Sequence, residues 1–318
     1  MDDSLLVGSK ESLLNVMSEM PKLGKVEFGE LDAGECTHLG MKIRRAVDAT
    51  GKFELWVSQP ITLMKLFEAE EKWMKKARTG GAGGIRVDKD GVLEDATDFR
   101  SVLMTAAYVQ RTRPDIREMV AKLTPKMQSP TEVDATRLRS LVKYLRETED
   151  FEMRIATVDS LEVRVSADAS FATGTKGRSI SGLHLSLGTN GATMYARSTT
   201  QGSVAMSTCE AEIGAISLAA QEALWVAKMM RGQGEAVPRV VIENDNTSAI
   251  HLLKTGPTGK GRTKWLDVKT FWVHAKLEDQ ELELEYTKSE ELVADGFTKG
   301  LGGEAFRKWR TRVLNWKA

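Results

Sequence analysis

The sequence predicts an α/β chain in which a mostly helical segment precedes a mixed sheet flanked by helices. Between Asp98 and Glu149 the apolar residues recur at helical spacing, whereas beyond Phe151 stretches such as 163–168 alternate apolar and polar residues. In this second half, three strand patterns precede a long helical pattern, and further strands alternate with helices after it. The resulting order, βββ-α-β-α-α-β-α, is typical of a mixed sheet with helices on its faces.

The N-terminal part of the chain combines a helical pattern at 13–20 with short strands expected at 37–43 and 53–57. A basic helix is expected at about 62–78, and the glycine-rich stretch 80–84 follows it. This stretch lacks the Lys-Ser/Thr ending of a phosphate-binding loop, and no apolar strand precedes it. We therefore interpret it as a flexible linker.

The middle of the chain is expected to be helical throughout, with helices at 99–110, 115–127 and 131–147. Pro114 supplies a fixed φ at the start of the second helix, and Pro130 stands just before the third. Because the alternating patterns begin directly after this segment, we expect a domain boundary near 149–151.

The second half should contain five strands and four helices. The predicted strands are 163–168, 182–188, 191–197, 239–243 and 281–286, with a hairpin turn at 189–191. The predicted helices are 208–231, 247–253, 264–278 and 290–299.

Composition narrows the class of protein. A chain of 318 residues suggests two or three domains, and its 45 basic and 45 acidic residues give no net charge. That balance argues against a strongly basic nucleic-acid-coating protein, although a local basic strip remains compatible with a nucleic-acid substrate. No apolar run approaches the about 20 residues of a membrane span, and the acidic start is unlike a secretory signal. Two cysteines and four histidines fit no usual zinc site, and we expect an intracellular protein.

Aspartates at the ends of apolar strands are the most informative feature. Asp168 closes the first strand of the second half, and Asp245 directly follows another. A carboxylate beside an apolar core is costly unless a cation or hydrogen-bond donors compensate it. Several such residues at one place would suit Mg²⁺, which prefers oxygen ligands. The alternative for each aspartate is a cap on the following helix.

Several motifs carry a family resemblance. They are Val165-Ser-Ala-Asp168-Ala-Ser, Gly177-Arg-Ser-Ile-Ser-Gly182, Met206-Ser-Thr-Cys-Glu-Ala-Glu212, Glu243-Asn-Asp245-Asn-Thr-Ser-Ala-Ile250 and Leu292-Val-Ala-Asp295-Gly-Phe-Thr-Lys299. With these motifs, in this order, residues 155–314 resemble the ribonuclease H domain of copia-type retrotransposon Pol polyproteins. The resemblance implies a ribonuclease H-like mixed five-stranded sheet and metal-dependent endonucleolytic hydrolysis of RNA in RNA/DNA hybrids. It also implies two Mg²⁺ ions, with Mn²⁺ as an alternative.

The first half agrees with this resemblance. Residues 98–108, 112–116 and 141–148 resemble the segment that links reverse transcriptase to ribonuclease H in those polyproteins. Residues 39–43 resemble the end of the polymerase palm, and Met1-Asp2-Asp3 resembles the aromatic-X-Asp-Asp box cut at its start. The resemblance implies a truncated palm remnant at 1–60, a helical thumb or connection at 61–150 and the ribonuclease H-like domain at 151–318. Polymerase activity is not expected, because the fingers and most of the palm are missing.

By resemblance, the metal-binding acids are Asp168, Glu212, Asp245 and Asp295. Glu210 competes with Glu212, but two positions on a helix point about 200° apart, so only one can face the site. Glu212 lies at the edge of the apolar face, in the setting Glu212-Ile-Gly-Ala215 typical of the family. We expect Glu212 at the site and interpret Glu210 as an acid in the first helical turn.

A basic loop and a basic C-terminus are the candidate contacts to nucleic acid. We expect Lys260, Arg262 and Lys264 to bind the backbone of an RNA/DNA hybrid, against the alternative of a solvated loop. The family's Lys-His-Ile-Asp motif is replaced by Lys264-Trp-Leu-Asp267, and His274 is interpreted as a packed helix residue. The competing interpretation is therefore a non-catalytic nucleic-acid-binding or structural remnant. Other expected partners are parts of a retrotransposon polyprotein, and the expected location is cytoplasmic or nuclear, in a virus-like particle where the element is intact.

Overall fold

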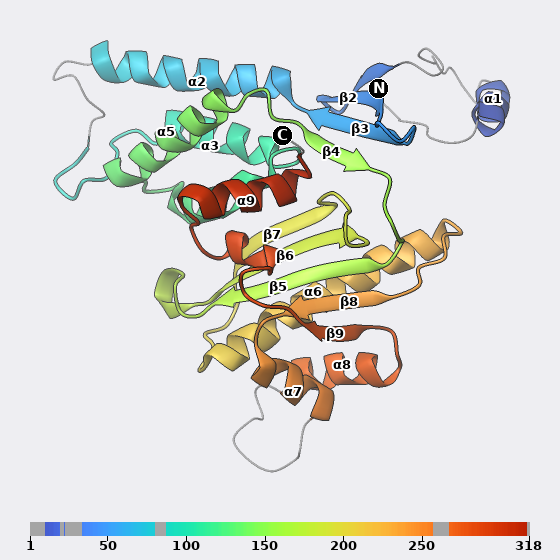
Figure 1. The fold of residues 1–318 in the computed structure, drawn as a ribbon. Helices are drawn as coiled ribbons and strands as arrows, with labels where there is room; N and C mark the ends of the chain where they lie inside the picture. The colour runs from blue at the N-terminus through green and yellow to red at the C-terminus, as the bar shows by residue number, and fades with distance from the viewer. Residues whose placement is uncertain (1–9, 20–21, 23–33, 80–86, 257–266, 317–318) are drawn as a thin grey trace.

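The computed structural model describes residues 10–19, 22, 34–79, 87–256 and 267–316, and these residues form two sheets (Figure 1). The first sheet is antiparallel, in the order β1-β2-β3-β4. Its strands are β1 (Glu35–His38), β2 (Met41–Val47), β3 (Phe53–Ser58) and β4 (Met153–Ala156), and helix α1 (Lys10–Glu19) precedes them. None of the helices in the described part of the chain has the length and apolarity needed to cross a bilayer.

The first predicted strand is wrong in one respect. Residues 37–43 do not form one strand but belong to the hairpin of β1 and β2, in which His38 pairs with Met41. Leu39 makes the turn with a φ of 49° and is held there by Tyr108, whose hydroxyl donates to the Leu39 carbonyl oxygen at 2.8 Å. Leucine rarely adopts a positive φ, so its side chain gave no turn signal. The strand predicted at 53–57 is confirmed as β3.

Beside the first sheet, helices form a separate layer with a core of their own (Figure 1). Their bounds are α2 (Pro60–Thr79), α3 (Thr97–Val109), η2 (Pro114–Ile116), α4 (Arg117–Leu123), η3 (Thr124–Lys126) and α5 (Glu132–Glu147). Their core includes Leu66, Phe99, Leu103 and Leu138, which are fully buried. The single helix predicted at 115–127 is instead broken into η2, α4 and η3, and Pro125, which lacks an N–H, stands in the last of these turns.

The boundary between the two sheets lies later than predicted. Strand β4 pairs with β3 through Val57 and Met153, so residues beyond the expected boundary at 150/151 still belong to the first sheet. A buried ion pair between Arg154 and Glu54, 2.6 Å from Nε to Oε2, strengthens this pairing. No local sequence pattern indicates that β4 pairs with a strand about a hundred positions earlier. The chain therefore passes to the second sheet over 157–162.

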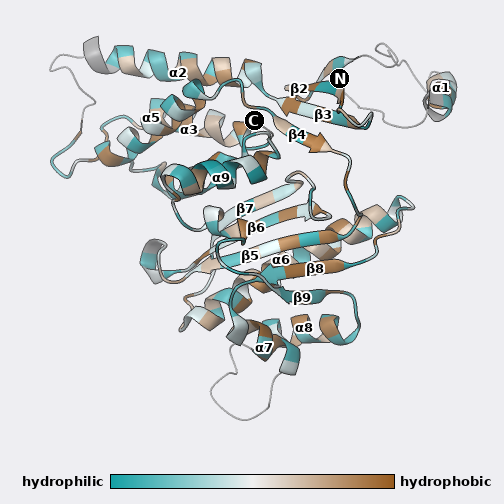
Figure 2. Ribbon diagram, in the orientation of Figure 1, coloured by the Kyte–Doolittle hydropathy of each residue, from teal (hydrophilic) through white to brown (hydrophobic). Residues whose placement is uncertain are grey.

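The mixed five-stranded sheet predicted from the sequence is confirmed. Its strands are β5 (Val163–Ser170), β6 (Ile180–Leu187), β7 (Tyr195–Thr200), β8 (Val240–Asn244) and β9 (Glu283–Tyr286), in the order β7-β6-β5-β8-β9. β5, β8 and β9 run parallel, whereas β6 is antiparallel to β5 and to β7. The alternation along β5 buries Val163, Val165 and Ala167 against α6 (Thr208–Gly232), and the hydrophobic colour of β6 and β8 marks the same core (Figure 2).

Three further helices belong to the half of the chain that contains the second sheet. Helices α7 (Thr247–Thr255) and α8 (Asp267–Glu278) pack beside α6, and α9 (Gly303–Leu314) lies between the helical layer and the sheet (Figure 1). α9 joins the two parts because Phe306 contacts Tyr144, with ring centroids 5.6 Å apart, and the Arg310 guanidinium lies 4.4 Å from the Phe151 ring centroid.

Two local predictions in this half are wrong. The connection between β6 and β7 is longer than the predicted turn at 189–191, because it covers 188–194 and is held by Thr193, whose hydroxyl donates to the Val313 carbonyl oxygen at 2.6 Å. The helix predicted at 290–299 is only the short 3₁₀ helix η5 (Val293–Phe297). Here Gly296 leaves the space into which the Trp309 ring packs, and a side chain at this position would collide with that ring. Both departures depend on contacts with α9, which lies later in the chain.

Candidate active site

Three aspartates meet at one end of the second sheet. One carboxylate oxygen each of Asp168, Asp245 and Asp295 lies within 4.8 Å of the others. Asp168 is on β5 and Asp245 directly follows β8, and these two strands are parallel neighbours with Ser166 opposite Glu243. Their carboxyl ends therefore deliver both side chains to the same edge. These three residues are called the aspartate group below.

Asp295 reaches this edge because η5 lies against the middle of the sheet. Gly182 on β6 pairs with Asp168 on β5, and a Cβ at Gly182 would lie 2.7 Å from the Ala294 carbonyl oxygen. Only glycine permits this approach without moving η5 away from the strands. The Gly182 of the sequence motif thus has a structural purpose, which is to let Asp295 contact the other two aspartates.

The three carboxylates of the aspartate group have one basic partner among the described residues, Lys299. Asp168 is only 2% exposed, and the Thr298 hydroxyl donates a hydrogen bond to it. Burial raises the pKa of Asp168 to about 6, and the charges of Asp295 and Asp245 add to this rise, while Thr298 and Lys299 oppose it. The Lys299 ammonium lies 3.0 Å from Asp295 Oδ1 and 4.0 Å from Asp168 Oδ2.

Glu212 lies beside the aspartate group but is not one of its members. Its Oε2 accepts a hydrogen bond from Asn244 Nδ2 at 2.9 Å, and the same amide donates to the Ala167 carbonyl oxygen. Burial and the negative charges of Asp168 and Asp245 together raise the pKa of Glu212 to about 8, against the hydrogen bond from Asn244, which lowers it. Of the four acids expected to converge, the three aspartates lie together. The fourth, Glu212, lies next to them and is held there by Asn244.

Glu210 has a different task at the start of α6. Its carboxylate accepts from the Met206 backbone N–H at 2.7 Å, while its own N–H donates to Ser207 Oγ at 3.1 Å. Ser207 is thus the N-cap of α6, and Glu210 accepts from the N–H of the residue before that cap. Glu210 therefore stabilises the first turn of the helix that places Glu212.

Sequence reasoning assigned no role to Asn244, Ser289, Thr298 or Lys299. Asn244 is completely buried on β8, where the alternation predicts an apolar side chain facing the core. A polar residue at such a position is the signal that could have identified it. The Ser289 hydroxyl donates to Asp245, but an exposed serine in a loop carries no comparable signal.

Comparison of the sequence with known proteins finds relatives among the polyproteins of plant transposons. The retrovirus-related Pol polyprotein from transposon TNT 1-94 of Nicotiana tabacum is 27% identical over 94% of this chain and 23% of its own length. The corresponding polyprotein from transposon RE1 of Arabidopsis thaliana is 26% identical over 70% of this chain and 15% of its own length. The chain is a homologue of retrovirus-related Pol polyproteins of plant transposons.

The chain spans less than a quarter of the length of these curated Pol relatives. No family model matches it. Among solved structures it is similar to the ribonuclease H1 LC11 isolated from compost, with 18% identity and a TM-score of 0.35, over 46% of this chain and 97% of that chain.

The residues of the aspartate group in this Pol homologue fit a hard divalent cation. Its donors are carboxylate oxygens, the ligands that Mg²⁺ prefers, and they come from three separate elements. The raised pKa of Asp168 and of Glu212 reflects acid that the nearby Lys299 does not neutralise. A divalent cation would supply the missing positive charge.

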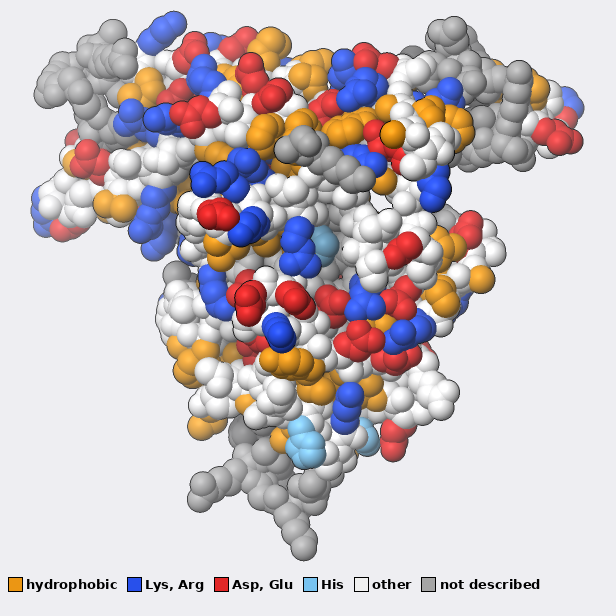
Figure 3. Space-filling view, viewed as in Figure 1, with side chains coloured by type: hydrophobic (Ala, Val, Ile, Leu, Met, Phe, Trp, Pro, Cys, Tyr) orange, Lys and Arg blue, Asp and Glu red, His pale blue; other side chains and the backbone are white. Residues whose placement is uncertain are grey.

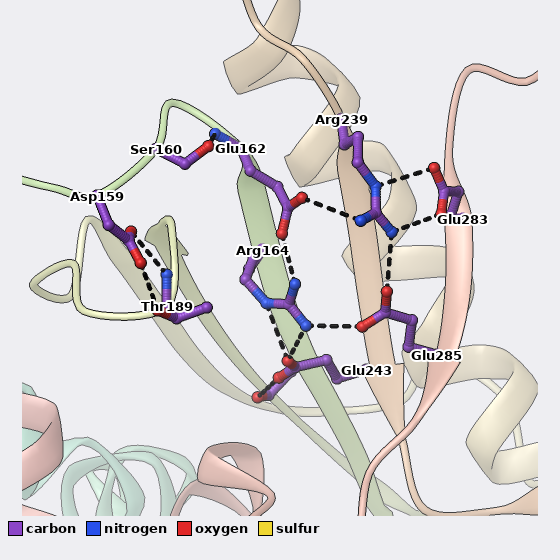
Figure 4. Close-up of polar contacts among 10 residues, drawn as sticks. Asp159, Ser160, Glu162, Arg164, Thr189, Arg239, Glu243, Glu283 and Glu285 are labelled. Carbon is purple, nitrogen blue, oxygen red and sulfur yellow. Dashed lines mark hydrogen bonds and ion pairs between the residues drawn. The ribbon is translucent and has the colours of Figure 1, made fainter.

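A second acidic cluster lies on the same strands, and each of its glutamates contacts an arginine (Figure 4). Arg164 lies on the same face of β5 as Asp168, and its guanidinium contacts Glu243 at 2.6 Å and Glu285 at 2.8 Å. Arg239 lies 2.6 Å from Glu283 and also contacts Glu285. We call this set the arginine ladder, and its members are Arg164, Arg239, Glu162, Glu243, Glu283 and Glu285.

Of the basic residues predicted to contact nucleic acid, the structure describes those of the C-terminal helix but not those of the loop. Lys260, Arg262 and Lys264 lie outside the described residues. His274 Nδ1 lies 3.0 Å from the Leu253 carbonyl oxygen, which agrees with a packed helix residue. Lys and Arg side chains gather over α9 in the space-filling view (Figure 3), but Arg310 stacks on Phe151.

Proposed function

We propose that this chain hydrolyses the RNA strand of RNA/DNA hybrids in a metal-dependent endonucleolytic reaction. The observation that carries the proposal is the convergence of three carboxylates within 4.8 Å at the end of parallel strands, in a chain homologous to Pol polyproteins. Asp168, Asp245 and Asp295 would hold the metal, and Glu212 would complete the catalytic set. Mg²⁺ is the expected ion, with Mn²⁺ as an alternative, in a site for two ions.

The chemistry divides between the metal and the chain. Bound divalent ions would activate water and stabilise the charge that develops on the phosphodiester. The chain's own part is to orient its carboxylates: Thr298 fixes Asp168, Ser289 contacts Asp245, and Asn244 holds Glu212. Because burial raises the pKa of Glu212 to about 8, this carboxyl keeps a proton at neutral pH, and we expect it to lose the proton when a cation binds.

The specificity for hybrids would come from shape and from 2′-hydroxyl contacts, because only the RNA strand carries that group. Lys260, Arg262 and Lys264 would contact backbone phosphates. Replacing all three by neutral residues should lower the salt slope of the binding constant by about two to three, since each phosphate contact releases counterions. Unchanged affinity and slope would instead indicate a solvated loop.

We also propose the correspondence of the chain's parts. Residues 1–60 would be a palm remnant, 61–150 a thumb or connection and 151–318 the ribonuclease H-like domain, with β4 completing the first sheet. Upstream and neighbouring parts of a Pol polyprotein would be its physical partners.

A cleavage assay tests the function directly. A hybrid labelled on either strand is incubated with the protein in Mg²⁺, in chelator, and with the Asp168→Asn variant. We expect cleavage of the RNA strand alone, and only with Mg²⁺ and the parent protein. Binding of the hybrid without cleavage in any divalent ion would support the non-catalytic alternative instead.

A further inference from the structure

A cavity of about 740 Å³ lies between the helical layer and the second sheet. One wall comes from α4 and η3, and the other from the loop after β5 and the edge strand β7. Thr298 also lines this cavity, and its hydroxyl is the one that donates to Asp168. A single residue therefore belongs both to the cavity and to the surroundings of the aspartate group.

The cavity wall is predominantly basic. Five basic residues line it against one acid, Glu118: Arg117, Lys122, Lys126, Arg137 and Arg197. Three of these bases have acidic partners: Lys122 pairs with Glu118, Arg137 with Asp134 at 3.6 Å, and Arg197 with Glu222 at 3.1 Å. Among the described residues, Arg117 and Lys126 have no such partner. Hydroxyl groups supply much of the remaining polar lining: Thr124, Thr173, Ser198, Thr199, Thr200 and Thr298.

Arg117 is the decisive residue. Its Nε is buried and has no hydrogen-bond partner, and burial lowers the pKa of this guanidinium. The neighbouring Arg113 shows what a satisfied buried arginine looks like, since it binds Asp115 through Nε at 3.0 Å and Nη2 at 2.8 Å. A buried donor without an acceptor, on a partly buried charge without an acidic partner among the described residues, is costly. An anion in the cavity would remove that cost.

The chemistry of the wall favours a phosphodiester backbone. A guanidinium presents a planar fork of donors that matches phosphate oxygens. Hydroxyl and lysine donors likewise bind phosphate and sugar without reading bases. Thr298 sets the cavity next to the aspartate group, because it lines the cavity and its hydroxyl donates to Asp168.

We propose that this cavity holds backbone phosphates of the nucleic acid whose scissile bond lies at the aspartate group, with Arg117 as the central contact. The helical segment of α4 and η3 is then part of the substrate site rather than only a connection. This inference rests on the proposed function, because it assigns a second contact to the same substrate.

The test compares Arg117→Gln, Arg117→Lys and a control, Arg139→Gln, which removes an exposed arginine of α5 outside the cavity lining. Binding of a short RNA/DNA hybrid is measured in chelator, so that cleavage does not enter. We expect Arg117→Gln to bind about tenfold more weakly, as for the loss of a charge-assisted hydrogen bond. Its salt slope should fall by about 0.7 to 0.9, one phosphate contact. Arg117→Lys should keep the slope, and Arg139→Gln should match the parent.

A melting curve without nucleic acid separates binding from packing. Arg117→Gln should melt at the parent's temperature or above it, because it removes a partly buried charge that has no acidic partner among the described residues. A clearly lower melting temperature together with unchanged hybrid affinity would show a structural residue and overturn the inference. A second result would also overturn the inference. In it, inorganic phosphate or a mononucleotide raises the parent's melting temperature, but hybrid binding does not depend on Arg117.

The two hypotheses fail in different ways. If the parent binds hybrid and Arg117→Gln binds equally well with the same slope, only this inference falls. If the parent binds hybrid through Arg117 but cleaves nothing in Mg²⁺, only the proposed catalysis falls. A parent that does not bind hybrid at all overturns both.

Discussion

Two acidic clusters on the same face of β5 and β8 differ in how their charge is balanced. In the arginine ladder each glutamate contacts an arginine, and contacts with Arg164 and Arg239 hold the pKa of Glu285 below its ordinary value although burial opposes this. In the aspartate group the nearby base is Lys299, and burial raises the pKa of Asp168. Acids alone therefore do not mark a site. The acids that mark a site are those that the fold gathers without a basic partner for each of them.

The largest expected effect is on hybrid cleavage, which should depend on the aspartate group and not on the arginine ladder. Asp245→Asn should lower hybrid cleavage by about a thousandfold or more, because metal ions contribute several kcal/mol to transition-state stabilisation. Binding of hybrid should persist or improve, since one negative charge near the phosphate is gone. Glu283→Gln in the arginine ladder is the matched control and should cleave like the parent. Equal loss in both variants would break the comparison.

Stability should show the reverse pattern. Arg164→Met leaves Glu243 without a basic partner among the described residues and leaves Glu162 and Glu285 with Arg239 alone, and it should lower the free energy of unfolding by about 3 kcal/mol. Chemical denaturation measures this, and cleavage per folded molecule should be retained. Adding Glu243→Gln should restore part of the loss, because the double variant removes both charges of one contact. No rescue would mean that the ladder acts through packing of the arginine stem.

The two clusters should also respond oppositely to pH when chelator is present. Asp168 and Glu212 have pKa values of about 6 and about 8 in the fold, above their ordinary 3.8 and 4.5. Below pH about 3 both carboxyls are mostly protonated in the folded and unfolded states. As the pH rises to about 8, the unfolded chain releases these protons first, so folding stability falls by several kcal/mol.

Asp168→Asn should show a smaller loss over this pH range, measured by denaturant unfolding at each pH. The ladder has the opposite sign, because the lowered pKa of Glu285 stabilises the fold at neutral pH and this contribution disappears in acid. A parent whose stability does not fall between pH 4 and 8 in chelator would mean that the aspartate group is already compensated.

The smallest effect separates the two glutamates of α6. Glu210→Ala removes the carboxylate that accepts from the Met206 N–H at the start of α6 and should cost about 1 kcal/mol of stability, while cleavage stays near the parent's rate. Glu212→Gln should lose cleavage. If the activities were reversed, Glu210 would be the residue that acts at the site.

Much of the sheet could be predicted because its signals are local. The alternation at 163–168 gives β5, and Thr131 with Asp134 forms the capping box that starts α5 after Pro130. The aspartates could be proposed from their place at strand ends together with the family resemblance. All these features can be read within a few consecutive residues.

The remainder depends on contacts between distant residues. The pairing of β3 with β4 joins Val57 to Met153, and no pattern near either residue indicates the other. Holding Glu212 requires Asn244, which reaches it only because α6 packs under β8. The unpaired charge of Arg117 likewise exists only because α4 packs against the second sheet.

Thermal unfolding as a function of Mg²⁺ tests the central claim most directly, because an ion that binds only the folded chain stabilises it in proportion to occupancy. The melting temperature of the parent and of Glu283→Gln should rise with Mg²⁺, by the equivalent of about 1.4 kcal/mol at ten times the dissociation constant. Asp245→Asn should respond much more weakly. A parent whose melting temperature is unaffected by Mg²⁺, or an Asp245→Asn variant that responds as strongly, would contradict a metal site at the aspartate group.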